Sequence, residues 1–220
     1  MTPTAGGAFQ EKLGMWIRAG APFPGNPCPA LFLDRDGVIV EDPGYLGRAA
    51  DVVMIPGAAE TIASANRAGI AVVEATNQSG IGRGYFGWRE FEEVEAAVTR
   101  ELARAGAVVD AVLACPYHRD GIRPWAHAAH PARKPRPGML LTAARLLNLD
   151  LANSWIVGDK LSDLAAGRNA GLRGGLHVLT GHGAQHREAV AGLQAEGFEV
   201  RLADSILDAA ALLPLMAGTR

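Results

Sequence analysis

The sequence has few features of a secreted, membrane-embedded or nucleic-acid-binding protein. Only two cysteines, Cys28 and Cys115, occur in 220 residues, so no disulfide framework is expected. No apolar run approaches the roughly 20 residues of a membrane span, and residues 1–20 lack the apolar stretch of a signal peptide. The net charge of -2 argues against nucleic acid or an anionic membrane as a partner. A protein of the reducing cytoplasm, monomeric or weakly self-associating, is the simplest interpretation.

What is present instead is an alternation of apolar strands and amphipathic helices. An apolar content of 49% is enough for one good core. We interpret residues 1–28, rich in Gly and Pro, as an arm that lies on the domain or is partly disordered, and residues 29–220 as the domain. Strands are expected near 30–33, 70–75, 111–114, 155–157, 176–179 and 198–202, and helices near 58–68, 87–105, 138–147, 161–169, 185–195 and 205–213. This alternation predicts an α/β fold with a mainly parallel central sheet covered on both faces.

Polar side chains follow three of the expected strands. Asp34 and Asp36 come directly after the first strand, Thr76 after the second and Asp159 after the fourth. Ligands of parallel α/β sheets bind at the carboxyl ends of the strands, so we expect these side chains to share one site. A carboxylate can attack phosphorus, and two close aspartates bind a hard cation that neutralises the charge of a phosphate ester. Taken alone, the first pair is explained equally well as an acidic turn.

Three further segments carry groups suited to a phosphate ester. The run 76–80 (Thr-Asn-Gln-Ser-Gly) offers hydroxyl, amide and backbone N–H groups, although a helix cap or turn uses the same residues. Lys134 would neutralise the transferring phosphoryl group and Arg133 would grip a second anionic group, or both form a solvated basic turn. Asp159 is the natural third metal ligand, with Asp163 behind it. The four motifs, in this order, favour a metal-dependent phosphatase.

Four segments together resemble the haloacid dehalogenase (HAD) superfamily phosphatases: 34–38 (DRDGV), 76–86 (TNQSGIGRGYF), 133–139 (RKPRPGM) and 158–163 (GDKLSD). Within the superfamily, the chain is most similar to the group of D-glycero-D-manno-heptose-1,7-bisphosphate 7-phosphatases and histidinol-phosphate phosphatases. The resemblance covers residues 29–180. It implies a HAD-like Rossmannoid three-layer fold without a large cap domain, in which loops shape the pocket.

The resemblance also implies roles for the matching residues. Asp34 would be the nucleophile, Asp36 the general acid and base, and Thr76 and Lys134 would hold the phosphoryl group. Magnesium would bind Asp34, the backbone carbonyl of Asp36, and Asp159. The substrate contacts would be Asp42, Gly44, Tyr45, Asn77, Gln78, Ser79, Arg133 and Lys160.

The loop 116–132 departs from the pattern of the group, in which three cysteines and a histidine often hold a structural zinc. The matching positions here are Cys115, Tyr117, His130 and Ala132. Of these, only Cys115 has the residue type that the group has at that position. An alternative zinc site of Cys and His ligands would use Cys115, His118, His127 and His130. We instead favour a zinc-free loop that is shaped by its prolines.

The leading hypothesis is a magnesium-dependent hydrolase that cleaves the phosphate ester of a small phosphorylated metabolite through an aspartyl-phosphate intermediate. Within that class we favour the 7-phosphate of a heptose 1,7-bisphosphate, because Arg133 offers a contact for a second anionic group. The alternatives are histidinol phosphate, another small sugar or nucleotide phosphate, and phosphoryl transfer to another alcohol. A catalytically silent phosphate-binding module would be expected to lack Asp34 or Asp36, and both are present.

Overall fold

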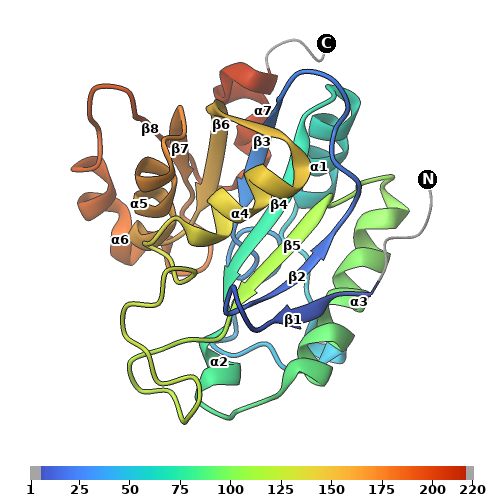
Figure 1. Ribbon diagram of the computed structural model, residues 1–220. Coiled ribbons are helices and arrows are strands. Elements are labelled where there is room, and N and C mark those ends of the chain that lie inside the picture. Colours follow the sequence, from blue (N-terminus) through green and yellow to red (C-terminus); the bar gives the residue numbers. More distant parts are fainter. Residues whose placement is uncertain (1–5, 217–220) are drawn as a thin grey trace.

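The computed structural model describes residues 6–216, whose strands form an eight-stranded sheet (Figure 1). The strands are β1 (Ala8–Gln10), β2 (Met15–Ala19), β3 (Cys28–Leu33), β4 (Ala71–Asn77), β5 (Ala111–Cys115), β6 (Leu149–Gly158), β7 (Gly174–His177) and β8 (Glu199–Leu202). Their order across the sheet is β1-β2-β5-β4-β3-β6-β7-β8. The strands from β5 to β8 in that order pair in parallel, whereas β2 pairs antiparallel with β1 and with β5.

Helices cover both faces of this sheet. They are α1 (Ala58–Arg67), α2 (Ser79–Gly82), α3 (Trp88–Arg104), α4 (Gly138–Leu147), α5 (Leu161–Ala170), α6 (Gly183–Ala191) and α7 (Ala209–Leu212), with 3-10 turns η1 (Ala49–Asp51), η2 (Ile206–Asp208) and η3 (Pro214–Met216). In Figure 1, α4 lies in front of the sheet, and α1 and α3 lie to its right. The arrangement has the three layers that the sequence predicts.

Alternation along the buried strands explains the layers. Leu31 and Leu33 of β3 pack into a cluster with Ile62 of α1. Phe32, between them, packs on the other face with Met139 of α4. All of these side chains are buried, as expected for a parallel strand with helices on both sides. The predicted α/β fold is confirmed, and the segments after β3 and β4 consist of loops and the helices α1 to α3 rather than a separate domain.

The N-terminal segment differs most from its expected form. Residues 1–5 of the predicted arm lie outside the described residues. From Ala8 to Ala19 the chain forms a hairpin, β1 and β2, that extends the sheet beyond β5. The reason is local: Met15 and Trp16 are apolar and become 3% exposed when β2 pairs with β5. The boundary between arm and domain at residue 28 stays a prediction.

Other elements differ in their limits. The strand expected at 155–157 is the end of a longer β6, because Asn148 adopts a left-handed φ of 58° and ends α4 directly before Leu149. The helix expected at 185–195 is α6 and ends at Ala191, next to Gly192. The helix expected at 205–213 is divided into η2 and the short α7.

The parallel strands all end on the same side of the sheet. Asp34 follows β3, Gln78 follows β4, and Asp159 follows β6. This is the edge at which ligands of such sheets bind, so the fold places the predicted site residues together. None of the helices described between residues 6 and 216 has the length and hydropathy of a membrane span.

Candidate active site

Three buried acids and one buried lysine meet at the ends of β3 and β6. The Nζ of Lys134 lies 3.1 Å from Oδ1 of Asp34 and 2.7 Å from Oδ1 of Asp163. Oxygen atoms of Asp34, Asp159 and Asp163 all lie within 4.8 Å of one another. All four side chains are at most 7% exposed, so water screens these charges little.

Glycine makes the close approach of these acids possible. Gly37, in the turn after β3, has a φ of +88°, and a Cβ there would lie 2.7 Å from Oδ2 of Asp159. Gly181 has a φ of +60° and approaches the same carboxylate, its absent Cβ falling 2.5 Å from Oδ2. The Asp159 carboxylate is therefore enclosed by backbone on two sides, which fixes its place beside Asp34.

Asp36 points to a different set of partners. Its carboxylate accepts hydrogen bonds from Nε and Nη2 of Arg35, at 2.9 and 3.0 Å, and from Nε2 of Gln78 at 2.9 Å. Arg35 is fully buried and also donates to Glu95 at 3.0 Å. Although burial lowers it, the neighbouring carboxylates of Asp36 and Glu95 raise the pKa of Arg35 above its usual value, so the guanidinium stays charged.

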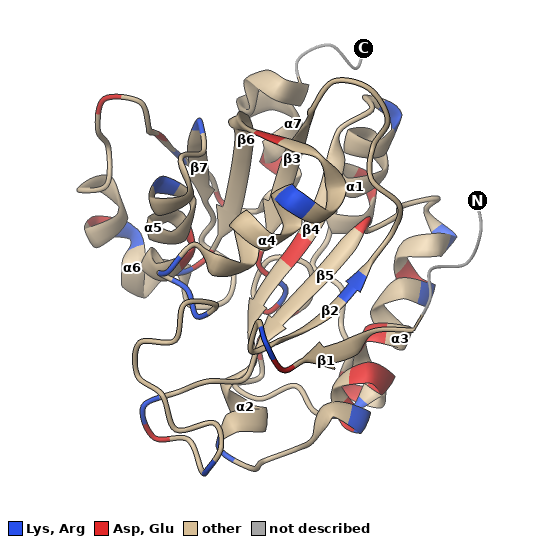
Figure 2. Ribbon diagram, viewed as in Figure 1, with Lys and Arg blue, Asp and Glu red and all other residues tan. Residues whose placement is uncertain are grey.

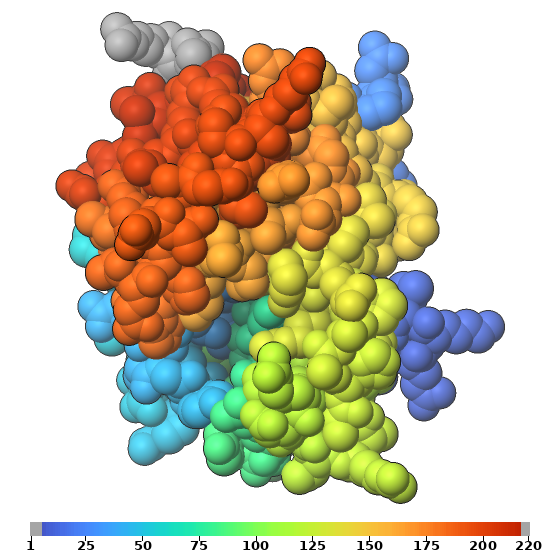
Figure 3. Space-filling view, turned by 90° about the vertical axis from the view of Figure 1, so that its left-hand side faces the viewer, coloured from blue at the N-terminus to red at the C-terminus, as the bar shows by residue number. Residues whose placement is uncertain are grey.

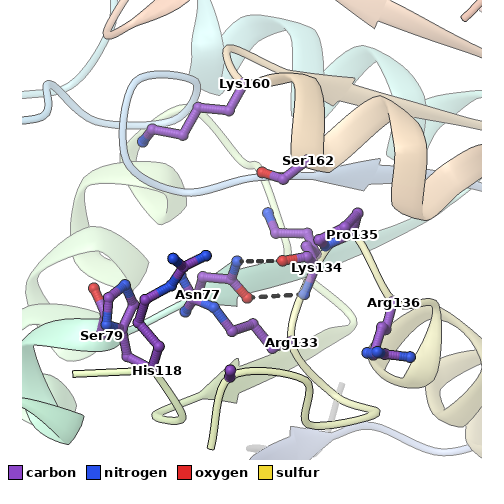
Figure 4. A pocket seen from close by; sticks show the side chains of 11 residues that line it. Asn77, Ser79, His118, Arg133, Lys134, Pro135, Arg136, Lys160 and Ser162 are labelled. Carbon is purple, nitrogen blue, oxygen red and sulfur yellow. Dashed lines mark hydrogen bonds between the residues drawn. The ribbon is translucent and has the colours of Figure 1, made fainter. Parts of the chain in front are cut away.

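The end of β4 supplies the groups expected to hold phosphate. Thr76 is buried, and its Oγ1 accepts a hydrogen bond from Nε2 of Gln78 at 2.9 Å. Asn77 holds the backbone of Lys134 from both sides: its Nδ2 donates to the Lys134 carbonyl and its Oδ1 accepts from the Lys134 N–H, each at 3.1 Å (Figure 4). This pair of bonds fixes the lysine over Asp34.

The electrostatics of the acids favour a bound cation. Burial and the neighbouring Asp34 raise the pKa of Asp159 to about 7. Burial also raises the pKa of Asp163, although Lys134 opposes this effect. Oδ1 of Asp159 is buried and has no hydrogen-bond partner within residues 6–216. A divalent ion would satisfy that atom and neutralise the crowded carboxylates, and hard oxygen ligands suit magnesium.

Asp163 lies in the same cluster of acids as Asp34 and Asp159. Its Oδ2 accepts a hydrogen bond from the N–H of Lys160 at 2.9 Å, which caps the start of α5. Its Oδ1 faces Lys134. Both oxygens are thus engaged by the protein, in keeping with the predicted supporting position. The ligand roles of all these acids stay predictions.

Two neighbouring cavities open beside the acids, and Asn77, Ser79 and Lys160 line both. The larger, about 380 Å³, is basic, with Arg133, Lys134 and four further residues that carry nitrogen or hydroxyl groups: His118, Arg119, Arg136 and Ser162 (Figure 4). The smaller, about 200 Å³, is lined by Asp36, Asp42, Gly44, Tyr45, Gln78 and His182 among others. Each of the eight predicted substrate contacts lines one of these cavities.

The cavities open on one face of the molecule. Figure 3 shows a hollow between the orange C-terminal part, the light-blue segment near residue 45 and the yellow-green loop that follows β5. In Figure 2 that loop, at the lower left, carries Lys or Arg positions on both sides of an acidic one. The basic cavity therefore takes much of its wall from this loop.

His182 and Thr180 belong to the site but were not predicted for it. The N–H of His182 donates to Oδ2 of Asp159 at 2.8 Å, and its ring Nε2 lies 3.2 Å from Oδ2 of Asp42. Nζ of Lys160 lies 3.2 Å from that same oxygen. Thr180 donates its hydroxyl to the carbonyl of Gly37. The signal was available, because both residues follow a parallel strand, β7, at the edge where the other site residues lie.

The proposed set of zinc ligands does not converge. Cys115 is fully buried at the end of β5, and burial raises the pKa of its thiol to about 12. The His118 ring lies beside Nη2 of Arg83 at 3.2 Å, and the His130 ring stacks on Tyr117. In the described part of the chain, the group of three acid, His or Cys side chains close enough to hold an ion is Asp34, Asp159 and Asp163. The geometry gives no support to a zinc site in the loop.

The chain is similar to known proteins over most of its length. A family model described as HAD-hydrolase-like matches residues 131–209. The D-glycero-β-D-manno-heptose-1,7-bisphosphate 7-phosphatase of Mesorhizobium japonicum is 53% identical over 164 residues, 74% of this chain and 75% of that protein. The protein of the same name in Escherichia coli K12 is 39% identical over 153 residues, 70% of this chain and 80% of that protein.

Solved structures of related proteins also align with most of this chain. A HAD-like protein from Mesorhizobium loti aligns with a TM-score of 0.83 and 44% identity, covering 96% of this chain and 98% of that chain. The D,D-heptose 1,7-bisphosphate phosphatase of B. bronchiseptica, solved with magnesium and phosphate, aligns with a TM-score of 0.72 and 35% identity, covering 84% of this chain and 97% of that chain.

Proposed function

The chain belongs to the HAD-like phosphatases, within the group of heptose 1,7-bisphosphate 7-phosphatases, and we propose from this premise that it hydrolyses the 7-phosphate of D-glycero-β-D-manno-heptose 1,7-bisphosphate. The observation that carries the substrate is the basic cavity of about 380 Å³ directly beside Lys134. A monophosphate needs one anion site at the acids. A bisphosphate needs a second, and Arg133 with its basic neighbours offers it.

Asp34 acts as the nucleophile of this reaction. One of its carboxylate oxygens attacks phosphorus, and the bond from phosphorus to the sugar oxygen breaks. Asp36 gives its proton to that leaving oxygen, then takes a proton from the water that attacks the aspartyl phosphate. Asp34 is released together with inorganic phosphate. The hydrogen bonds from Arg35 and Gln78 hold Asp36 at the edge of the smaller cavity, where the leaving sugar would lie.

Lys134 and Thr76 hold the phosphoryl group during both steps. Lys134 is fully buried between Asp34 and Asp163, so its charge faces the place where phosphorus would bind. Magnesium, when bound, neutralises the phosphoryl oxygens, and Asp34, Asp159 and the backbone carbonyl of Asp36 would hold it. Asp159 keeps its free oxygen for that role.

A panel of phosphate esters tests the proposal. The purified protein is assayed with heptose 1,7-bisphosphate, histidinol phosphate, common sugar monophosphates and an aryl phosphate, with and without magnesium. We expect the highest kcat/KM for the bisphosphate and dependence on magnesium for every ester. A higher value for histidinol phosphate would reassign the substrate. Absence of phosphate release from all esters at any magnesium concentration would refute an enzyme of this class.

The setting of the reaction is also part of the proposal. Cys28 and Cys115 are free thiols, which suits a reducing compartment, so we place the reaction in the cytoplasm. We expect the protein to be a monomer or a weak homo-oligomer. The partner is a small phosphorylated sugar, with no role for nucleic acid or a membrane.

A further inference from the structure

The N-terminal hairpin (β1, β2 and the turn between them) lies against the loop that leads to Arg133. We propose that this hairpin positions Arg133 for the second anionic group of the substrate, a role that rests on the function proposed above. Figure 3 shows the dark-blue hairpin beside the yellow-green loop. The hairpin contributes no residue to either substrate cavity. Its action on the site therefore passes through the loop.

The turn of the hairpin contacts the loop at Gly14. This residue is buried and has a φ of +64°. A Cβ there would lie 2.5 Å from the Cε1 atom of His130 and 3.0 Å from Cε2 of Tyr117. The rings of Tyr117 and His130 are stacked, with centroids 3.8 Å apart and an angle of 11° between their planes. The backbone of the turn thus closes directly on this ring stack and leaves no room for a side chain.

The first strand of the hairpin makes a second contact through Phe9. The Phe9 ring lies 5.0 Å from Trp125 in the loop and 5.4 Å from Trp88 at the start of α3. Trp125 in turn meets the edge of Tyr117, with centroids 5.5 Å apart. Aromatic pairs at these distances are favourable, and the two that involve Trp125 are edge-to-face. Phe9 therefore packs on both the middle of the loop and the start of α3, whose rings also contact each other.

Arg133 takes its position from the same ring stack. Its Nη1 donates to the carbonyl of Tyr117 at 2.8 Å, and its backbone N–H donates to the carbonyl of His130 at 2.9 Å. Both anchors of Arg133 are thus members of the stack on which Gly14 closes. A shift of the stack would carry the guanidinium with it. Recognition of a second anion by a guanidinium depends on such placement, whereas attack by Asp34 does not.

Gly14→Ala tests this inference because it pushes on the ring stack. The matched control is Gly25→Ala, since Gly25 also has a positive φ, of +79°, in the N-terminal segment, but a Cβ there would meet nothing within 4 Å. We expect Gly14→Ala to raise KM for heptose 1,7-bisphosphate roughly tenfold, with kcat for an aryl phosphate changed less than about twofold. We expect Gly25→Ala to change neither constant.

Phe9→Ala is the second variant, in case the new side chain at residue 14 prevents folding. Gln10→Ala, at the exposed neighbouring position, is its control. Amide hydrogen exchange provides a readout that needs no substrate. The backbone N–H groups of His118 and His127, which pair with Trp125 and His118 across the loop, should exchange faster in Gly14→Ala and Phe9→Ala than in the controls. The amides of β3 and β4 should exchange as in the wild type.

The outcomes separate this inference from the proposed function. Unchanged loop exchange with unchanged KM, or an equal loss with both substrates, would overturn the role of the hairpin. Faster loop exchange with a selective rise of KM for the bisphosphate would support it. If the wild type hydrolyses the aryl phosphate but not the bisphosphate, the proposed function is wrong. Loop exchange then decides alone whether the hairpin holds the segment that carries Arg133.

Discussion

The strand-end site and the loop 116–133 lie side by side but are held in place by different means. At the strand ends, Asp34 and Asp159 follow neighbouring parallel strands, and buried hydrogen bonds and glycine contacts fix them. In the loop, stacked and edge-to-face rings hold the segment that positions Arg133. The first region depends on sheet topology, which the phosphatases of this fold share. The second depends on packing with a hairpin. We therefore expect that changes in the loop alter substrate choice without altering the chemistry at the strand ends.

The largest effect should come from the strand-end site. Asp34→Asn removes the nucleophile while keeping the shape of the side chain, so we expect kcat to fall on the order of 10³-fold or more. The thermal unfolding temperature should stay near that of the wild type. Asp51→Asn, at an exposed position in η1, serves as the control. Substantial turnover by Asp34→Asn with every ester would assign the nucleophile elsewhere.

The second largest effect should come from removal of metal, which should impair the strand-end site but not the loop. Washing with a chelator is expected to reduce turnover to about 1% or less, and magnesium alone should restore it, because the crowded carboxylates need a cation to bind phosphate. The loop should be unaffected, since its rings hold it. Metal analysis of the washed protein tests whether the loop holds zinc. One zinc per chain after the wash would contradict our account of the loop.

A smaller and selective effect is expected in the basic cavity. Arg133→Ala should raise KM for the bisphosphate roughly tenfold and for a monophosphate much less, because one charged hydrogen-bonding group is lost. Arg123→Ala changes another arginine of the loop, one that does not line the cavity, and should leave both constants unchanged. Steady-state kinetics with both substrates give the comparison. An equal rise for both would remove the reason to favour a bisphosphate.

The smallest effect concerns a buried carboxyl that has no assigned role in catalysis. Glu74 of β4 is 1% exposed, and burial together with Glu95 raises its pKa well above its usual value. Its contribution to folding is therefore present at low pH and is lost as the pH rises toward the folded-state pKa. At about pH 4, Glu74→Gln should have the same free energy of unfolding as the wild type. At about pH 8, its free energy of unfolding should be higher by on the order of 1 kcal/mol.

Urea unfolding at both pH values measures this difference, and Glu60→Gln at an exposed position of α1 is the control. The kcat of Glu74→Gln should equal that of the wild type, since Glu74 lines neither cavity. A fall in kcat would mean that the carboxyl takes part in the chemistry. If Glu74→Gln and the wild type have the same free energy of unfolding at both pH values, the Glu74 carboxyl is ionised in the folded protein.

The sequence was sufficient for the parts of the molecule that follow local patterns. Apolar runs ending at Asp34 and Asp159 predicted both the parallel strands and the meeting of these two acids, because parallel strands end on one side. The eight residues expected to contact substrate came from the family resemblance; all of them line the cavities, and their contact with substrate stays a prediction. His182 was missed although it follows an expected strand, because its contacts with Asp159 and Asp42 join segments that are far apart in the sequence.

The hairpin and its contacts could not be predicted in the same way. Gly and Pro in residues 1–28 indicated an irregular arm, and a three-residue strand such as β1 is too short for a periodic signal. Phe9, Trp88 and Trp125 come from three distant parts of the chain, so their contact exists only after folding. Tertiary packing, rather than local preference, decides this region.

The two bonds between Asn77 and Lys134 have a consequence for protein engineering. One end of the loop is tied to β4 by these bonds, and the other end by the N–H of Gln78, which donates to the carbonyl of Cys115 at 2.8 Å. Both ties lie at the end of β4, one on its last residue, Asn77, and one on Gln78, which follows it. We therefore expect that residues 116–133 can be exchanged for the corresponding segment of a relative, together with the hairpin that packs on them, while the catalytic groups keep their places.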